Sequence, residues 1–310
     1  MVVGQFKRNH PEVYSMDGVG YVLAGVWGRE LFSVAYPLFM IFLAGSGFVA
    51  ISIAFNAITV HATCTVVWVV IAMLGTFALA SIQTLNKISI LGWIGFVSVM
   101  AAILIITVAV GIQDRPSAAP QLGPWDKNIS AFNSEGTFLG GMAAVSTVVF
   151  SYSGTPAVSI CIAPDQSSCQ FFNVVGEMRK PRDYNKALFV CQGTVMATYL
   201  TIGIVVYYYC GQYLANPALG SAGVMVKKIA YGVALPGLFV SVTIYTHVGA
   251  KMLFVRFLRG SEHLTSHSKT HWIVWLSTVA GCVTLSFILA MGTSRVLAIH
   301  SQQQSHSSAI

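Results

Sequence analysis

The stretch from Phe32 to Ile53, which reads FSVAYPLFMIFLAGSGFVAISI, decides the fold of this 310-residue chain. It carries no charge and is long enough for a helix to cross the hydrocarbon core of a bilayer, which takes ~20 residues. Between Leu31 and Gln113 the only charged side chain is Lys87. The whole chain is 55% hydrophobic and 9% charged, whereas soluble domains usually have ~25% charged residues. This composition excludes a disordered chain and an ordinary soluble enzyme, so the protein must be solvated by lipid.

Apolar stretches bounded by turn or polar residues predict seven membrane-spanning helices. Backbone polar groups in lipid must be satisfied within the segment, and the ten-residue alternating pattern of barrel strands is absent. The predicted fold class is therefore an all-α polytopic membrane protein. The predicted spans of the transmembrane domain (32–292) are residues 32–53, 63–82, 88–111, 138–157, 187–211, 229–248 and 272–291. Residues 1–31 form an N-terminal segment, and the polar residues 293–310 are predicted to be a disordered tail.

The distribution of Lys and Arg residues predicts the orientation in the membrane. The N-terminal segment and the loops on its side hold 12 of them, and the opposite side holds 5. Because loops rich in Lys and Arg stay in the cytoplasm, the N-terminal segment is predicted to be cytoplasmic. The loop after span 88–111 then faces outside, and it contains Asn128-Ile129-Ser130, an acceptor triplet for N-glycosylation that also arises by chance.

The fourth span ends in Ser151-Tyr-Ser-Gly-Thr-Pro-Ala157. Gly154 and Pro156 weaken a helix, and proline also removes a backbone donor, so we expect free carbonyls and amides at membrane depth. Such groups persist only inside protein or beside a water-filled cavity, as in the discontinuous helices of transporters. An unwound stretch suits a small zwitterion, because free amides face its carboxylate and free carbonyls accept from its ammonium. The alternative is that the glycines only allow close packing and Pro156 only ends the span.

This string and the charged string Glu177-Met-Arg-Lys-Pro-Arg-Asp183 resemble the amino acid/auxin permease family, specifically its fungal neutral amino acid permeases. Residues 2–14 resemble the family's cytoplasmic link between its second and third helices. The resemblance implies an eleven-helix inverted-repeat fold of the amino acid-polyamine-organocation type, of which about seven helices are present here. It also implies alternating-access transport of neutral amino acids by proton-coupled symport.

The resemblance further implies roles for single residues. The break in the fourth span and hydroxyls of the 229–248 span would contact substrate or a coupling ion; the substrate-binding candidates are Ser151, Tyr152, Ser153, Gly154, Thr155, Ser241 and Thr243, with Thr246 as a further hydroxyl. The charged string would form a gate through Glu177, Arg179, Lys180 and Arg182. Since ionisable residues inside spans are functional candidates, His247 is the candidate for proton coupling. The alternatives are hydroxyls bonded to their own helices, a solvated loop and a packed neutral histidine.

Two features depart from the family pattern. Residues 158–170 intervene where the family continues directly, and we interpret them as an insert, such as the product of an unspliced intron. The chain also begins at the end of the family's second helix and leaves the pattern after Ala290. We therefore expect this chain to transport poorly or not at all. An amino acid-sensing membrane receptor on the same fold and a non-functional fragment are the alternatives.

Other classes of function are disfavoured. No constellation of Asp, Glu, His or Cys lies within a span, which argues against an enzyme, and the cysteines lack zinc-type spacing. We expect no cofactor, no metal and no nucleic acid. The expected partners are a neutral amino acid, a coupling ion that is a proton rather than sodium, and the lipid bilayer. The plasma membrane is favoured over the vacuolar membrane.

Overall fold

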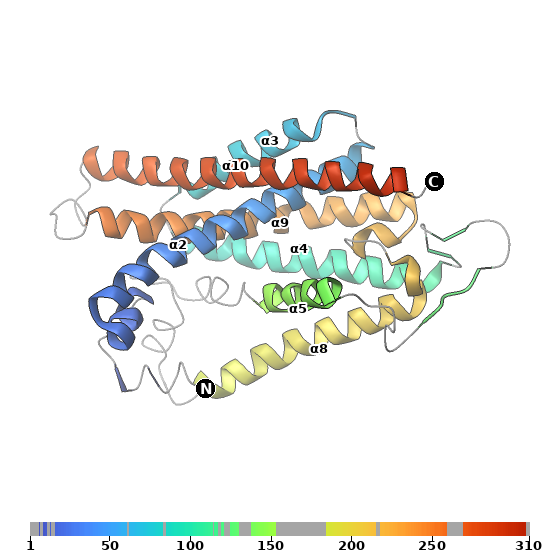
Figure 1. Cartoon of the computed structure of the whole chain (residues 1–310), viewed down its shortest axis with the longest axis horizontal. Coiled ribbons are helices and arrows are strands. Elements are labelled where there is room, and N and C mark those ends of the chain that lie inside the picture. Colours follow the sequence, from blue (N-terminus) through green and yellow to red (C-terminus); the bar gives the residue numbers. More distant parts are fainter. Residues whose placement is uncertain are drawn as a thin grey trace. The chain divides into compact units, whose positions relative to one another are not determined.

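A computed structural model describes residues 6, 9–10, 13, 16–60, 62–82, 85–113, 115–116, 119–120, 125–129, 138–152, 184–214, 218–258 and 269–307. Within these ranges every regular element is a helix, so the prediction of an all-α polytopic protein is confirmed. The elements are α2 (Met16–Thr59), α3 (Thr65–Ala80), α4 (Leu85–Ile112), α5 (Phe138–Tyr152), α8 (Tyr184–Cys210), the 3-10 turns η3 (Gly211–Tyr213) and η4 (Ala218–Ser221), α9 (Val224–Phe257) and α10 (Lys269–Ser307) (Figure 1).

Five helices in the described part of the chain are long and apolar enough to cross a membrane. They are Met16–Thr59, Leu91–Ile112, Gln192–Tyr213, Val224–Phe257 and Lys269–Thr293. Two shorter apolar helices, Thr65–Ala80 and Gly140–Val149, overlap the second and fourth predicted spans. Helices of these lengths satisfy their own backbone groups, as a lipid environment requires.

Several helices extend well beyond the apolar stretches that predict them. α2 starts at Met16, ahead of the span predicted from Phe32, and α10 continues to Ser307, through most of the segment expected to be a disordered tail. Hydropathy detects only the part of a helix that lies in hydrocarbon. Once the apolar part is helical, adding a further turn costs far less than nucleating a new one, so polar residues prolong it.

The chain divides into two units, which are considered separately. The first comprises Met1–Val13 and Ser98–Ala234, and the second comprises Tyr14–Val97 and Leu235–Ile310. Two of the three boundaries between them fall within α4 and α9, and the third falls between Val13 and Tyr14.

A cluster of buried side chains from α4, α8 and α9 forms the core of the first unit. Ile106 and Val110 of α4 pack with Val206 of α8 and Ala230 of α9. Hydrogen bonds between sequence-distant residues supplement this packing. One of them is donated by the Ser98 hydroxyl to the Val233 carbonyl at 2.5 Å. Such bonds matter in lipid, because burying apolar surface between helices there contributes little to their association.

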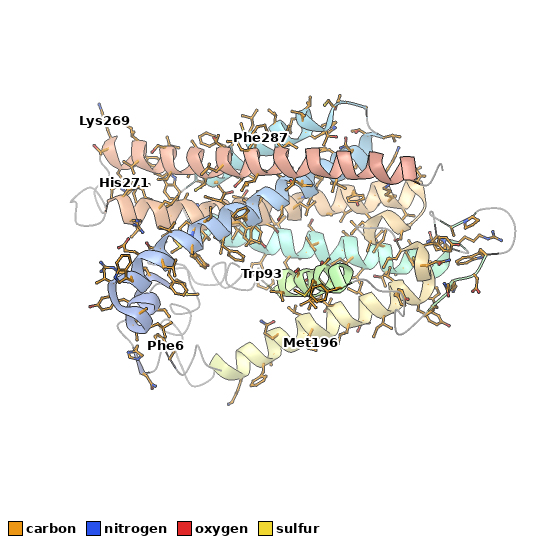
Figure 2. The ribbon with its side chains drawn as sticks, viewed as in Figure 1. Phe6, Trp93, Met196, Lys269, His271 and Phe287 are labelled. Carbon is orange, nitrogen blue, oxygen red and sulfur yellow. The ribbon has the colours of Figure 1, made fainter. Side chains whose placement is uncertain are left out.

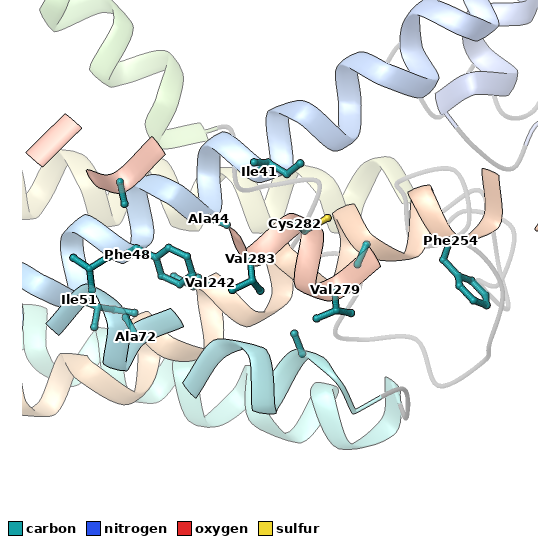
Figure 3. Packing of buried hydrophobic residues seen from close by; sticks show 14 of the residues in the cluster. Ile41, Ala44, Phe48, Ile51, Ala72, Val242, Phe254, Val279, Cys282 and Val283 are labelled. Carbon is teal, nitrogen blue, oxygen red and sulfur yellow. The ribbon is translucent and has the colours of Figure 1, made fainter. Parts of the chain in front are cut away.

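The second unit packs α2, α3, α9 and α10 around a fully buried phenylalanine, Phe48 of α2. Its cluster includes Ala72 of α3, Val242 of α9 and Val279 of α10 (Figure 3). α10 lies along α2 and α3 (Figure 1). Gly47 of α2 faces Val242, and a Cβ atom added at Gly47 would overlap the Val242 Cγ2 methyl. The absence of a side chain at Gly47 therefore sets how closely α2 and α9 approach.

α2 is kinked near its start. Ala24 and Gly25 have non-helical backbone angles, and Gly25 has a φ of 63° and a ψ of −144°. Few residues other than glycine adopt this conformation. The short arm before the kink packs back onto the helix, because a Cβ atom added at Gly20 would overlap the Gly28 carbonyl, and one added at Gly28 would overlap the Gly20 carbonyl.

Candidate functional site

Ser151, the first of the predicted substrate residues of the fourth span, lies at the end of α5, in the first unit. The Ser151 hydroxyl donates to the Thr147 carbonyl of its own helix at 2.9 Å. The Ser151 carbonyl accepts a hydrogen bond from the Tyr199 hydroxyl of α8 at 3.4 Å. α8 thus supplies a donor at the site where the break is predicted. Tyr152 is described only as helix backbone, and Ser153, Gly154 and Thr155 lie outside the described residues.

The charged string predicted to form a gate also lies outside the described residues, as does the predicted insert 158–170. The positions in that string are Glu177, Arg179, Lys180 and Arg182. A different ion pair is present in the second unit, where Arg256 Nη2 of α9 lies 2.6 Å from Glu30 Oε2 of α2. Both side chains are roughly half exposed, and pairs of that kind contribute only ~0–1 kcal/mol. Sequence reasoning missed this pair because nothing local relates charges 226 residues apart.

The predicted hydroxyls of α9 differ in their hydrogen bonding. Ser241 donates to the Gly237 carbonyl at 2.9 Å, and Thr243 donates to the Phe239 carbonyl at 2.8 Å. Both bond back to the preceding turn of their own helix, as Ser and Thr in membrane helices often do. The Thr246 hydroxyl is buried, and among the described residues it has no hydrogen-bond partner. Of these three side chains, Thr246 is therefore the one left with an unused donor.

His247 lies next to Thr246 in the interior of the second unit and is 2% exposed. Its Nδ1 atom is 3.3 Å from the Ala80 carbonyl of α3. Because a carbonyl oxygen can only accept, Nδ1 carries the hydrogen in this contact, which leaves Nε2 as the acceptor nitrogen of the neutral ring. The imidazole also meets the Trp275 ring of α10 edge to face, with ring centroids 5.0 Å apart.

Trp275 makes the matching contact on Ser81, the residue that directly follows α3. Its Nε1 donates to the Ser81 carbonyl at 3.1 Å. The final carbonyls of a helix have no partner within it, and in an apolar interior they need donors from elsewhere. His247 and Trp275 thus cap the end of α3 from two other helices. We call His247, Thr246, Ala80, Ser81 and Trp275 the α3 cap cluster.

One more buried hydroxyl belongs to the same face of α3. Thr76 lies one turn before Ala80, is fully buried, and its Oγ1 has no hydrogen-bond partner among the described residues. Side chains four residues apart share a helix face. Thr76 is not among the residues predicted from the sequence, although a threonine within an otherwise apolar helix was the available signal.

Two more charged or titratable groups, Lys269 and His271, lie at the start of α10, at least one turn before Trp275. Lys269 is exposed and His271 is partly buried, with its ring 4.9 Å from that of Phe254. Figure 2 shows Lys269 and His271 at one end of α10, with Phe287 farther along it. His271 therefore provides a contrast to the buried His247 within the same unit.

The glycosylation candidate, Asn128, lies in the first unit. Its side chain is exposed, and its backbone has a φ of 43°. Asparagine tolerates this left-handed conformation better than most residues. Asn128 Nδ2 is 3.5 Å from Gln212 Oε1, just beyond the end of α8.

Comparison with known proteins matches residues 2–301 to the family described as transmembrane amino acid transporter proteins. The chain belongs to this transmembrane amino acid transporter family. This membership confirms the resemblance identified from the two sequence strings. Since members of the family are transporters, it also confirms that the chain is not an enzyme. The protein is an integral, multi-pass membrane protein of this family.

Three fungal relatives of this family member are similar along nearly its whole length. A protein of Fusarium pseudograminearum named transmembrane transporter is 40% identical over 290 residues, and one of the same name from Gibberella moniliformis is 37% identical over 290 residues. Each match covers 94% of this chain and 58% of the relative. The N amino acid transport system protein of Neurospora crassa is 33% identical over 295 residues, which cover 93% of this chain and 59% of that protein. The chain thus spans less than two thirds of these relatives' length. No solved structure matches it.

Proposed function

We propose that this chain serves in the transport of neutral amino acids across the plasma membrane by alternating access, coupled to proton movement. Membership of the transmembrane amino acid transporter family supports amino acid transport. A relative named N amino acid transport system protein supports the same class of substrate. The observation that carries the proposal furthest is the α3 cap cluster, which combines an ionisable side chain with an unsatisfied hydroxyl in the interior of a membrane protein.

The proposed substrate site includes residues 151–155, of which Ser151 lies at the end of α5. An amino acid zwitterion needs acceptors for its ammonium group and donors for its carboxylate. The Ser151 carbonyl already accepts from the Tyr199 hydroxyl, so a substrate ammonium would replace that donor or share the oxygen, which has two lone pairs. Ser241 and Thr243 of the second unit stay separate substrate-binding candidates, because their hydrogens are used within α9 while their oxygens accept no hydrogen bond that the structure shows among the described residues.

Proton coupling is assigned to His247. With Nδ1 directed at the Ala80 carbonyl, Nε2 is the nitrogen that would take up a proton. Protonation would place a positive charge near the carbonyl end of α3, where the helix dipole favours a cation. Protonation that strengthens or weakens the hydrogen bond from His247 to the Ala80 carbonyl would then change the capping of α3. Proton binding would in this way affect how α3 packs.

The remaining assignments complete the proposal. The N-terminus is cytoplasmic, and Glu177 with Arg179, Lys180 and Arg182 forms charge pairs that differ between inward-open and outward-open states. The excess of Lys and Arg on the N-terminal side supports this orientation.

The proposal is tested by reconstituting the chain in vesicles and comparing His247→Gln with His271→Gln. Two quantities are measured with a radiolabelled neutral amino acid: accumulation driven by an imposed pH gradient, and counterflow without a gradient. Glutamine can still donate to the Ala80 carbonyl but cannot take up a proton. We expect the unaltered chain to show weak counterflow and weak gradient-driven accumulation, because it spans only part of its relatives' length. His247→Gln should keep that counterflow and lose that accumulation, and His271→Gln should keep both.

Three results would contradict parts of this proposal. Gradient-driven accumulation by His247→Gln at the unaltered level would remove His247 from proton coupling. Accumulation of the unaltered chain that ignores the pH gradient would exclude proton coupling altogether. Binding of the amino acid without any counterflow would replace transport by the sensing alternative.

A further inference from the structure

The segment of residues 125–129 is attached to the end of α8 in the first unit. The Gln212 backbone N–H donates to the Lys127 carbonyl at 3.1 Å. Gly211 allows this contact, since its φ is 54° and a Cβ atom there would overlap the same carbonyl. Lys127 Nζ lies 5.3 Å from the ring centroid of Tyr208 and 5.5 Å from that of Tyr209. The segment therefore has a defined position beside a group of aromatic side chains.

These aromatic side chains are placed as an interfacial belt would be. Tyr207, Tyr208 and Tyr209 are consecutive at the end of the apolar helix Gln192–Tyr213, and the Tyr213 ring lies 6.1 Å from that of Trp125. Tyrosine and tryptophan gather where a membrane helix meets water. The end of α8 is thus the position at which the chain leaves the hydrocarbon, and segment 125–129 lies on the water side of it.

The other end of α8 carries the charges that orient it. The helix starts at Tyr184, directly after a cluster of basic residues, and Lys186 in its first turn is exposed. Loops with such clusters stay in the cytoplasm. The apolar part, Gln192–Tyr213, has 22 residues, which at 1.5 Å per residue is ~33 Å and enough for one crossing. Asn128, at the far end of α8, then faces the exterior or the lumen of the secretory pathway.

Asn128 combines that location with an acceptor sequence and access. Asn128-Ile129-Ser130 is the only Asn-x-Ser/Thr triplet in the chain. The Asn128 side chain is exposed, and Ile129 is 47% exposed. The 3.5 Å contact of Nδ2 with Gln212 Oε1 needs only one of the two amide hydrogens.

We propose that Asn128 carries an N-linked oligosaccharide, taken from a lipid-linked oligosaccharide diphosphate. The Asn128 amide nitrogen forms a C–N bond to the anomeric carbon of the first sugar. The bond from that carbon to the diphosphate oxygen breaks, the amide loses one proton, and the lipid diphosphate leaves. Nδ2 keeps its second hydrogen for Gln212. The inference rests on the proposed orientation of the chain and is independent of transport.

The test uses the full chain expressed in fungal cells and treated with peptide-N-glycosidase. We expect the unaltered chain to migrate faster on a denaturing gel after treatment. Asn128→Gln and Ser130→Ala should show no shift, because each removes the triplet. Asn133→Gln is the matched control, since Asn133 lies in the same loop outside any triplet and its change should leave the shift intact.

An unaltered chain whose mobility is the same before and after treatment would overturn the proposal. A shift that persists in both Asn128→Gln and Ser130→Ala would overturn it as well, because the glycan would then lie elsewhere. An N-terminal epitope, detected in intact and in permeabilised cells, shows which assumption failed. Detection in intact cells refutes the orientation and the glycan together, whereas detection only after permeabilisation, with no shift, refutes the glycan alone.

Discussion

Replacing Trp275 by phenylalanine should destabilise the second unit, because it removes one of the two donors that cap α3. The Trp275 Nε1 bond to the Ser81 carbonyl is 3.1 Å long and partly buried. Leaving a buried carbonyl without a donor costs ~1–3 kcal/mol in proteins generally. Interhelical hydrogen bonds in membranes average nearer ~0.6 kcal/mol, with maxima close to ~2. We expect about 1–2 kcal/mol, which lowers the ratio of folded to unfolded protein about 5- to 30-fold.

The assay is thermal unfolding of the purified chain in detergent. At ~2–4 °C per kcal/mol for a chain of comparable size, the expected fall in Tm is about 2–8 °C. Trp272→Phe is the matched control, because Trp272 lies three residues earlier on α10 and is 43% exposed. Phenylalanine at position 275 keeps an aromatic ring beside His247 and Phe254, so most of the edge-to-face packing survives.

Lost ring volume has to be separated from the lost hydrogen bond. Benzothienylalanine at position 275 replaces the indole N–H by sulfur and keeps the size of the ring, so it should lower Tm nearly as much as Trp275→Phe does. If Trp275→Phe and Trp272→Phe unfold at the same temperature, the capping argument is refuted. If the benzothienylalanine variant unfolds like the unaltered chain, packing rather than capping explains any effect of phenylalanine.

Three further predictions concern contacts within the second unit, each measured by the same thermal unfolding. Gly47→Ala should lower the free energy of unfolding by ~1–3 kcal/mol, because the added methyl group overpacks against Val242, a β-branched residue with little rotamer freedom. Val242→Ala should partly restore stability in the double variant, and a double variant whose stability loss is the sum of the two single losses would contradict this. Glu30→Arg should lower stability by less than ~1 kcal/mol and the exchange of Glu30 with Arg256 should restore it, whereas no recovery would show that the 2.6 Å pair contributes nothing. Ser286→Ala should cost ~0.5–1.5 kcal/mol, because its buried hydroxyl donates to a carbonyl of α2 at 3.0 Å; an unchanged Tm would count against that bond.

The class of the protein could be predicted from the sequence because it depends on local composition. A charge-free run of ~20 residues has no stable place other than a membrane helix or a protein core, and this chain has too few charges to be soluble. The family followed from two short strings, Ser151 to Ala157 and Glu177 to Asp183, and the family match over residues 2–301 confirms it.

The ends of the helices were less predictable. Hydropathy shows which residues of a helix lie in the hydrocarbon. A helix ends, by contrast, where its backbone groups lose their intrahelical hydrogen-bond partners. The continuation of α10 to Ser307 lies in polar sequence, and the kink of α2 at Gly25 lies within an uncharged, largely apolar run, residues 18–28, whose composition does not indicate a kink. Neither could be read from the apolar runs alone.

The predicted site residues remain proposals where the structure does not describe them, as at Ser153 and Glu177. Where it does describe them, it distinguishes side chains that are equivalent in sequence. The hydroxyls of Ser241 and Thr243 donate to carbonyls of their own helix, whereas the Thr246 hydroxyl has no hydrogen-bond partner among the described residues. The difference depends on the neighbours of each position, so the residue types alone could not have given it.

The sequence by itself determined that this protein is an all-helical membrane protein of a transporter family, since apolar run length, charge placement and short motifs are properties of neighbouring residues. Only the tertiary structure decided that His247 and Trp275 cap the end of α3. Those contacts join residues 167 and 194 positions apart. Carbonyls at a helix end within an apolar interior must find donors, but which side chains supply them depends on how the helices pack. The sequence thus marked His247 as a candidate, and the fold placed it against the end of another helix.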